Sequence, residues 1–243
     1  MILDIYKDSL EYSAKDWKTL VILGVIALFS FLLLPLFLLS GYNYRVVKTA
    51  VNGIINGRDP LPDFDDFVGM FVDGVKVVIV QVVYIIVPIA IFFIFAAIAS
   101  QLSGGFAVAT MAIGVLIALI IGIIACLMVQ MGVCHMAYND GEFSKAFALK
   151  EIKEVIDEIG WFKCIVTYIG LIIITLVIST VVASIIGFIF AAFGFSGLML
   201  GINTSGVFLL GMLLNISVSM FFVGPYLSIF NARSIGLLYT IQL

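Results

Sequence analysis

The chain has 243 residues, of which 63% are apolar and only 11% are charged, and its formal net charge is −3. Soluble domains contain about 45–50% apolar and roughly 25% charged residues, so this composition excludes an ordinary water-soluble globule and a disordered chain. It also disfavours nucleic-acid binding, because no part of the chain supplies the dense basic surface that phosphate contacts need.

The charged residues are confined to regions 4–18, 45–76 and 140–163 and to Arg233 alone. The uncharged stretches 77–139 and 164–232 are each far longer than the roughly 20 residues that cross a bilayer core once. Each stretch must therefore cross twice, which predicts an all-α integral membrane protein with one membrane domain over residues 1–243. In chain order we expect an N-terminal amphipathic segment (1–19), a first hydrophobic segment (20–44), a cytosolic loop (45–76), a hairpin (77–133), a cytosolic amphipathic helix (134–163), a second hairpin (164–230) and a C-terminal tail (231–243).

The first apolar run, residues 20–39, allows two arrangements. As one straight fifth span, it places Lys7, Lys15 and Lys18 on the side opposite all other basic residues. As a re-entrant hairpin bent near Pro35, it places every Lys and Arg on one side, which the positive-inside rule prefers. We favour the re-entrant hairpin.

An internal repeat supports the same choice. Three times the chain has a charged amphipathic segment, then a lysine, then an apolar run that ends at a polar stretch with a tyrosine. The lysines are Lys18, Lys76 and Lys163, and the tyrosines are Tyr42, Tyr138 and Tyr226. Equivalent units would all enter the membrane from the same side.

The loop before the first long hairpin is rich in proline and aspartate. Pro60 and Pro62 favour an extended chain, and Asp63 is placed to cap a helix whose first turn carries Asp65 and Asp66 near the positive end of its dipole. The same carboxylates could instead hold a divalent cation. Because the cap explains all three without a metal, we expect no metal site here.

The two long uncharged stretches predict four transmembrane helices in two hairpins. The expected spans are 77–99, 106–133, 164–193 and 207–230, with polar, glycine-rich turns at 100–105 and 201–206. The windows 106–133 and 164–193 exceed a perpendicular crossing, so we expect these two spans to tilt or their helix ends to emerge above the headgroups.

The segment between the hairpins, 142–159, has apolar residues at helical spacing on one face and charges on the other. This pattern predicts an amphipathic helix that lies on the membrane or caps the bundle. The alternative is a docking face for a cytosolic partner, formed by Phe147, Ile152, Val155 and Ile156.

Inside the long spans the chain has no Asp, Glu, Lys or Arg, which disfavours proton-coupled transport. Gln81 and Gln130 should lie at similar depth on antiparallel helices, which favours an amide pair across the hairpin. Asn215 and Ser219 mark the deepest polar position of the last span, where we expect an interhelical hydrogen bond or, alternatively, a small-molecule path. No cofactor is expected, and cysteines eight residues apart on one helix are too distant for a shared metal ion.

Small residues recur at intervals of four along two spans, from Thr110 to Cys134 and from Thr175 to Ala191. Such rows allow helix backbones to approach closely in a membrane, so we expect them to form packing seams within the chain or between copies of it. A pore lining of small residues is the functional alternative.

Three motifs carry a family resemblance: Ser40-Gly41-Tyr42-Asn43-Tyr44-Arg45, Leu61-Pro62-Asp63-Phe64 and Asp73-Gly74-Val75-Lys76. Together with the stretch 141–147 they resemble a prokaryotic, largely methanogen, family of polytopic membrane proteins of unknown function. The resemblance implies an integral plasma-membrane protein and assigns no catalytic residue.

These observations favour a non-enzymatic organising or accessory component of the plasma membrane, with its charged loops in the cytoplasm. The alternative is an oligomeric channel or facilitator for a small neutral or lipophilic solute. A lipid-modifying enzyme that uses Asp63, Asp65 and Asp66 is a third hypothesis. The expected partners are membrane lipids, with a second copy of the chain or another cytosolic or membrane protein as further alternatives.

Overall fold

The computed structural model describes residues 1–30, 32–200 and 204–242, and the regular structure of these residues is helical. The helices, in chain order, are α1 (Ile2–Ser13), α2 (Trp17–Leu28), α3 (Leu33–Val51), α4 (Phe67–Ala99), α5 (Gly104–Tyr138), the short 3-10 helix η1 (Phe143–Phe147), α6 (Leu149–Ile159), α7 (Trp161–Met199), α8 (Ser205–Val218), the π-helix η2 (Ser219–Val223), α9 (Gly224–Tyr239) and the 3-10 helix η3 (Thr240–Gln242).

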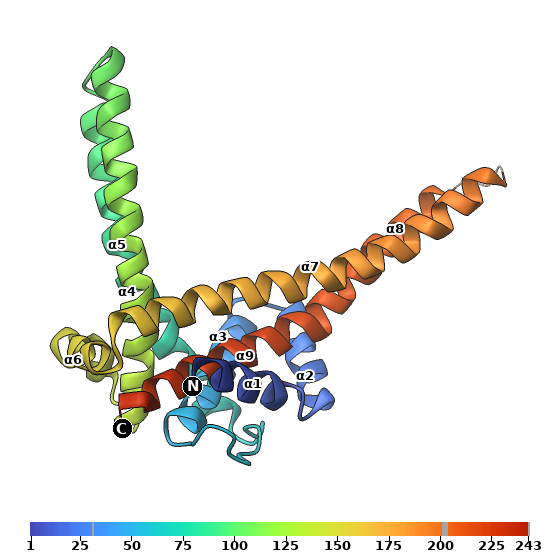
Figure 1. Ribbon diagram of the computed structural model, residues 1–243, viewed down its shortest axis with the longest axis horizontal. Helices are drawn as coiled ribbons and strands as arrows, with labels where there is room; N and C mark the ends of the chain where they lie inside the picture. The colour runs from blue at the N-terminus through green and yellow to red at the C-terminus, as the bar shows by residue number, and fades with distance from the viewer. Residues whose placement is uncertain (31, 201–203, 243) are drawn as a thin grey trace.

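Two long helical hairpins diverge from a compact base (Figure 1). One hairpin is α4 with α5, and the other is α7 with the continuous run α8–η2–α9. We call residues 82–126 and 172–219 the two arms. The base contains α1, α2, α3, α6 and the ends of the long helices that are remote from the hairpin turns, and it holds the main buried core.

Four helical segments are long and apolar enough to cross a membrane: α4, α5, α7 and the run Ser205–Tyr239. α4 has 33 residues and α7 has 39, so these two helices are about 50 and 58 Å long. A hydrocarbon core is only about 30 Å thick. The excess length enters the base, where Met70, Gly74 and Val80 of α4 are buried. All four charged regions of the sequence belong to the base, and the arms consist of uncharged residues.

The first apolar run does not form one straight helix. α2 ends at Leu28 and α3 begins at Leu33, so the one straight helix over 20–39 that the alternative arrangement requires is not formed. The break also precedes Pro35, where we expected the bend. Pro35 lies in the first turn of α3, a position at which proline is tolerated because its missing N–H has no helical partner.

The first of the two predicted hairpin turns is confirmed. α4 ends at Ala99 and α5 begins at Gly104, so the first hairpin turn falls within the expected 100–105. The second expected turn, 201–206, includes residues 201–203, which lie outside the described residues.

A buried arginine joins the two ends of the chain to the central loop. Arg233 of α9 is fully buried; its Nε donates to Asp8 Oδ1 at 3.0 Å and its Nη2 to Asp59 Oδ2 at 2.8 Å. Its guanidinium also lies 4.5 Å from the centre of the Tyr12 ring, and burial raises the pKa of the Tyr12 phenol to about 12. The second oxygen of Asp8 accepts the backbone N–H of Asn56 at 2.6 Å.

Two motif glycines allow α3 and α4 to cross at very close range. A Cβ at Gly41 would overlap the carbonyl oxygen of Met70, and a Cβ at Gly74 would overlap the carbonyl oxygen of Phe37. Both obstacles are backbone atoms, which cannot rotate away as a side chain can. The crossing therefore requires glycine at both positions.

We predict that Gly41→Ala and Gly74→Ala each lower the free energy of unfolding by at least about 1–3 kcal/mol, the usual result of overpacking. The measurement is the thermal unfolding midpoint of the purified protein in detergent. Gly187→Ala is the matched control, since a Cβ at Gly187 in α7 meets no atom within 4 Å. Equal midpoints for the three variants would contradict this account of the crossing.

Candidate binding site between the hairpins

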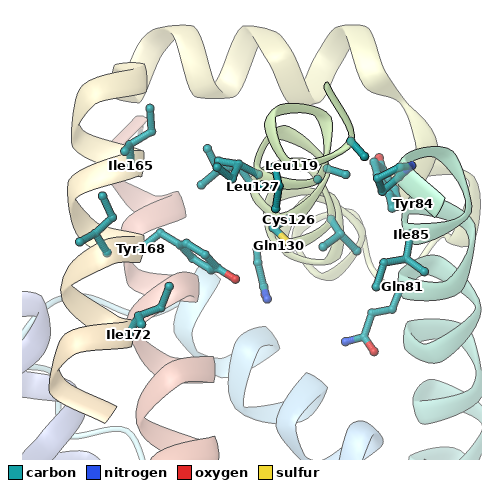
Figure 2. A pocket seen from close by; sticks show the side chains of 17 residues that line it. Gln81, Tyr84, Ile85, Leu119, Cys126, Leu127, Gln130, Ile165, Tyr168 and Ile172 are labelled. Carbon is teal, nitrogen blue, oxygen red and sulfur yellow. The ribbon is translucent and has the colours of Figure 1, made fainter. Parts of the chain in front are cut away.

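An apolar cleft separates the two hairpins where the arms leave the base. Its volume is ≈ 670 Å³, and its walls come from α4, α5 and α7. Ile85, Leu119, Ile165 and Ile172 are among the apolar lining residues, and Gln81, Gln130 and Tyr168 supply polar groups at one end. Figure 2 shows the Tyr168 hydroxyl directed toward Gln130, with the amides of Gln81 and Gln130 directed into the space between the helices.

The cleft has room because small residues line the α5 side. Ala118, Gly122 and Cys126 belong to the row at intervals of four and border the cleft. Further along the same row, Gly114 packs beneath the ring of Phe95, so α4 and α5 are in close contact there. The row is thus a packing seam in the α4–α5 arm at Gly114 and part of the cleft wall near the base.

Two smaller hollows continue the cleft into the base. One, of ≈ 220 Å³, has a lining that includes Asn43, Gln81, Gln130 and Asn231, and we call it the amide chamber. The other, of ≈ 330 Å³, is lined by Gln130, Tyr168 and Asn231 together with apolar residues of α7 and α9. Gln130 lines all three hollows and lies at their junction.

Three amides that border the chamber have no internal hydrogen-bond partner. Within the described part of the chain, the side chains of Asn43, Gln81 and Gln130 form no hydrogen bond. The Asn43 Oδ1 is buried, whereas Gln130 is half-buried and Gln81 is exposed. The expected bond between Gln81 and Gln130 is therefore wrong. Both amides border the cleft and the amide chamber, and no hydrogen bond joins them.

Asn215 and Ser219 line a separate hollow of ≈ 520 Å³ beside the π-helix η2. Here the expected interhelical bond is present, since Asn215 Nδ2 donates to the Ala183 carbonyl at 3.2 Å. Ser219 Oγ in turn donates to Asn215 Oδ1 at 3.4 Å. This hollow shares Asn43 and Ser228 with the amide chamber, so the two are neighbours.

The amphipathic helix α6 caps the bundle and does not present an open docking face. Ile152 and Ile156 are fully buried, Val155 is 7% exposed, and Phe147 stacks on Tyr84 of α4. The stripe is covered because α5, α7 and α9 of the same chain pack against it. The alternative prediction, that these residues form an open docking face for a partner, is therefore wrong.

Polar contacts fix α6 to α5. His135 Nε2 lies 2.9 Å from Glu151 Oε2, and its Nδ1 lies 2.7 Å from the Tyr239 hydroxyl. Lys145 Nζ also donates to Glu151 at 2.9 Å. The hydrogen bond from Lys145, and then that from His135, lowers the pKa of the Glu151 carboxyl.

The aspartate-rich loop is held by one arginine. Arg45 donates to the carbonyl oxygen of Asp66 at 2.7 Å and pairs with the carboxylates of Asp65 and Asp66 at 3.4 Å each. Asp66 caps α4, because its Oδ1 accepts the N–H of Gly69 at 2.9 Å. The expected cap at Asp63 is wrong, since Arg45 also binds the Asp63 carbonyl and holds this stretch outside the helix. Among the described residues no cluster of His, Cys, Asp and Glu is arranged to hold a metal ion.

Sequence reasoning found Gln81 and Gln130 but missed Asn43, Tyr168 and Asn231. Asn43 lies within the Ser40–Arg45 motif, which we interpreted only as a family motif and as the polar end of the first apolar run. One feature could have pointed to these three residues: each is an uncharged polar side chain on a helix that continues into the base.

The fold and the cleft define an all-helical protein that has four helices suited to cross a membrane and a hollow between its two hairpins. Residues 24–191 match the family described as "Protein of unknown function (DUF4013)", and the chain belongs to this family. The matched range contains the three motifs and every residue that lines the cleft. No curated protein and no solved structure matches the chain.

Asn215 has a hydrogen-bond partner and Gln130 has none, and this difference should change the free energy of unfolding of their variants in opposite ways. We predict that Asn215→Leu lowers the free energy of unfolding by about 0.6–1.7 kcal/mol, because it removes an interhelical hydrogen bond. Gln130→Met should leave it unchanged or raise it, since a partnerless polar group is replaced by an apolar group of similar shape. Thermal unfolding of both variants in detergent is the measurement, and greater destabilisation by Gln130→Met would contradict the assignment.

Proposed function

We propose that the protein is a non-enzymatic accessory component of the plasma membrane that binds an uncharged, largely apolar molecule in the cleft between its hairpins. The observation that carries this proposal is the composition of the cleft. Its described lining is apolar except for amide, phenol and thiol groups, with no Asp, Glu, Lys, Arg or His. An apolar pocket with a few convergent polar groups is the usual form of a small-molecule site.

The position of the cleft suits a molecule that arrives from the bilayer. The apolar side chains of the flanking arms face outward, among them Ile86 and Ile120, which are 54% and 59% exposed. In a membrane these surfaces contact lipid tails, so a lipophilic molecule can enter the cleft sideways without crossing water.

The proposed orientation places the base in the cytoplasm. Every Lys and Arg of the chain belongs to the base, which is the distribution that the positive-inside rule favours. The interrupted helices α2 and α3 support this orientation, because both lie in the base and neither extends along an arm (Figure 1).

A non-enzymatic role is favoured by the use of the acidic and motif residues. Asp65 and Asp66 are counter-ions of Arg45, Asp66 caps α4, and Tyr42 stacks on Phe64 with ring centres 4.8 Å apart. These contacts hold the loop to α3 and account for the residues without chemistry. The apolar stripe of α6 is buried, so it offers no surface through which the protein could organise a partner.

To test the proposed function, we would fill the cleft with Gly122→Leu. Gly122 lines the cleft, and a Cβ there meets only Pro88 at 3.8 Å, so the larger side chain can occupy the binding space without disturbing the helix. A diazirine-bearing analogue of oleyl alcohol in nanodiscs should label the cleft residues in a saturable way. We expect Gly122→Leu to weaken the apparent affinity by at least about tenfold.

Gly187→Leu is the matched control, because Gly187 is exposed on α7 and a Cβ there meets open space. It should leave saturable labelling unchanged. Labelling that is non-saturable, spread over all outward faces of the arms and equal in the two variants would overturn the proposal.

The second candidate function is a facilitator for a small neutral solute. It is favoured by one observation, that the amide chamber and the hollow of Asn215 share Asn43 and Ser228 and so form neighbouring compartments on the two sides of these residues. A solute would pass between α3 and α9 at this neck.

We predict for this candidate that liposomes with the protein release glycerol faster than protein-free liposomes, measured by stopped-flow light scattering. Ser228→Leu should abolish the difference by narrowing the neck. Ser217→Leu is the control, because Ser217 also donates only to a carbonyl of its own helix but is exposed on the arm. Release at the protein-free rate in the unaltered protein would exclude this candidate.

A further inference from the structure

We infer that the amide chamber is a headgroup subsite, and that the molecule held between the hairpins is an amphiphile with an uncharged, hydrogen-bonding head and an apolar chain. This inference rests on the proposed function and specifies its ligand. The chain would lie in the cleft of ≈ 670 Å³ and the head in the chamber of ≈ 220 Å³.

The unmet hydrogen-bonding capacity of the chamber is the first argument. Asn43, Gln81 and Gln130 come from three different helices and border one hollow. Each amide offers one acceptor oxygen and an NH₂ donor. Groups of this kind are usually paired when they are removed from water, because an unpaired buried amide is costly. Here the Asn43 Oδ1 is buried without a partner, and the described residues give the half-buried Gln130 and the exposed Gln81 no hydrogen bond, so a ligand that both donates and accepts hydrogen bonds suits the chamber.

The charge of the surroundings is the second argument. The charged residues near the chamber in sequence are engaged elsewhere: Arg45 with Asp65 and Asp66, Lys76 with the Gly141 carbonyl at 3.3 Å, and Arg233 with Asp8 and Asp59. The described lining of the chamber itself is uncharged. A phosphate, carboxylate or ammonium head would therefore be buried without a counter-ion, which strongly disfavours charged lipids.

The sizes of the compartments are the third argument. One water molecule occupies roughly 30 Å³ of liquid, so the chamber holds the equivalent of about seven waters. A hydroxyl or glycerol-sized head fits this space, whereas a sugar chain does not. The cleft is about three times larger and apolar, as an acyl or isoprenoid chain requires.

The arrangement has a structural origin in the motif glycines. The close crossing at Gly41 and Gly74 brings α3 against α4, and Asn43 lies two residues after Gly41 while Gln81 lies two turns after Gly74. The crossing that packs the two helices thus also brings two of the four amides, Asn43 and Gln81, to the chamber.

The test compares competitors that share one chain and differ in the head. The oleyl-alcohol photoprobe is bound to the protein in nanodiscs and displaced with monoolein, with oleyl sulfate or with octadecene. We expect monoolein to compete at least about tenfold better than the sulfate and the alkene. Gln130→Met and Asn43→Leu should remove this preference and leave the alkene's competition unchanged, whereas Gln101→Met, in the turn between α4 and α5, should leave the preference intact.

Two results would overturn the inference in distinguishable ways. If octadecene or oleyl sulfate competes as well as monoolein, the chamber does not select an uncharged head, although the cleft still binds a lipophilic molecule. If no competitor reduces labelling, the proposed function fails together with the inference. Unfolding midpoints of Gln130→Met and Asn43→Leu that equal or exceed the unaltered protein's will establish that any lost preference comes from the chamber and not from unfolding.

Discussion

The buried guanidinium of Arg233 is the interaction on which the arrangement of the hairpins depends. It binds Asp8 of the first helix and Asp59 of the central loop, and it belongs to the helix that continues the second arm. Removing one partner from a buried ion pair typically costs about 3–5 kcal/mol, because the remaining charge loses its compensation. The second arm is thereby held to the same base as the first, and the cleft exists because both arms rise from that base.

The family motifs serve this same base. Gly41 and Gly74 permit the α3–α4 crossing, Arg45 holds the loop that precedes α4, and Tyr42 stacks on Phe64 of that loop. These contacts determine where Asn43 and Gln81 lie relative to each other. Packing residues and binding residues are therefore neighbours in the sequence, although only the latter border the hollow.

The helical class, the four long apolar segments and the position of the first hairpin turn were predictable from local pattern. The placement of Gln81 and Gln130 beside one hollow also agrees with antiparallel helices. Their mutual bond was not predictable, because depth specifies position along a helix and not the direction in which a side chain points. The burial of Ile152 and Ile156 was similarly open, since an amphipathic stripe is equally suited to lipid, to a partner or to its own bundle.

By itself, the sequence determined which parts of the chain avoid water, because an ionic group in a hydrocarbon core is prohibitively costly and no such group occurs over 77–139 or 164–232. Only the tertiary structure decided that the two hairpins diverge, that Asp66 and not Asp63 caps α4, and that four amides from separate helices border one chamber. The physical reason is that solvation acts on each residue separately, whereas a shared hollow depends on contacts between residues far apart in the chain.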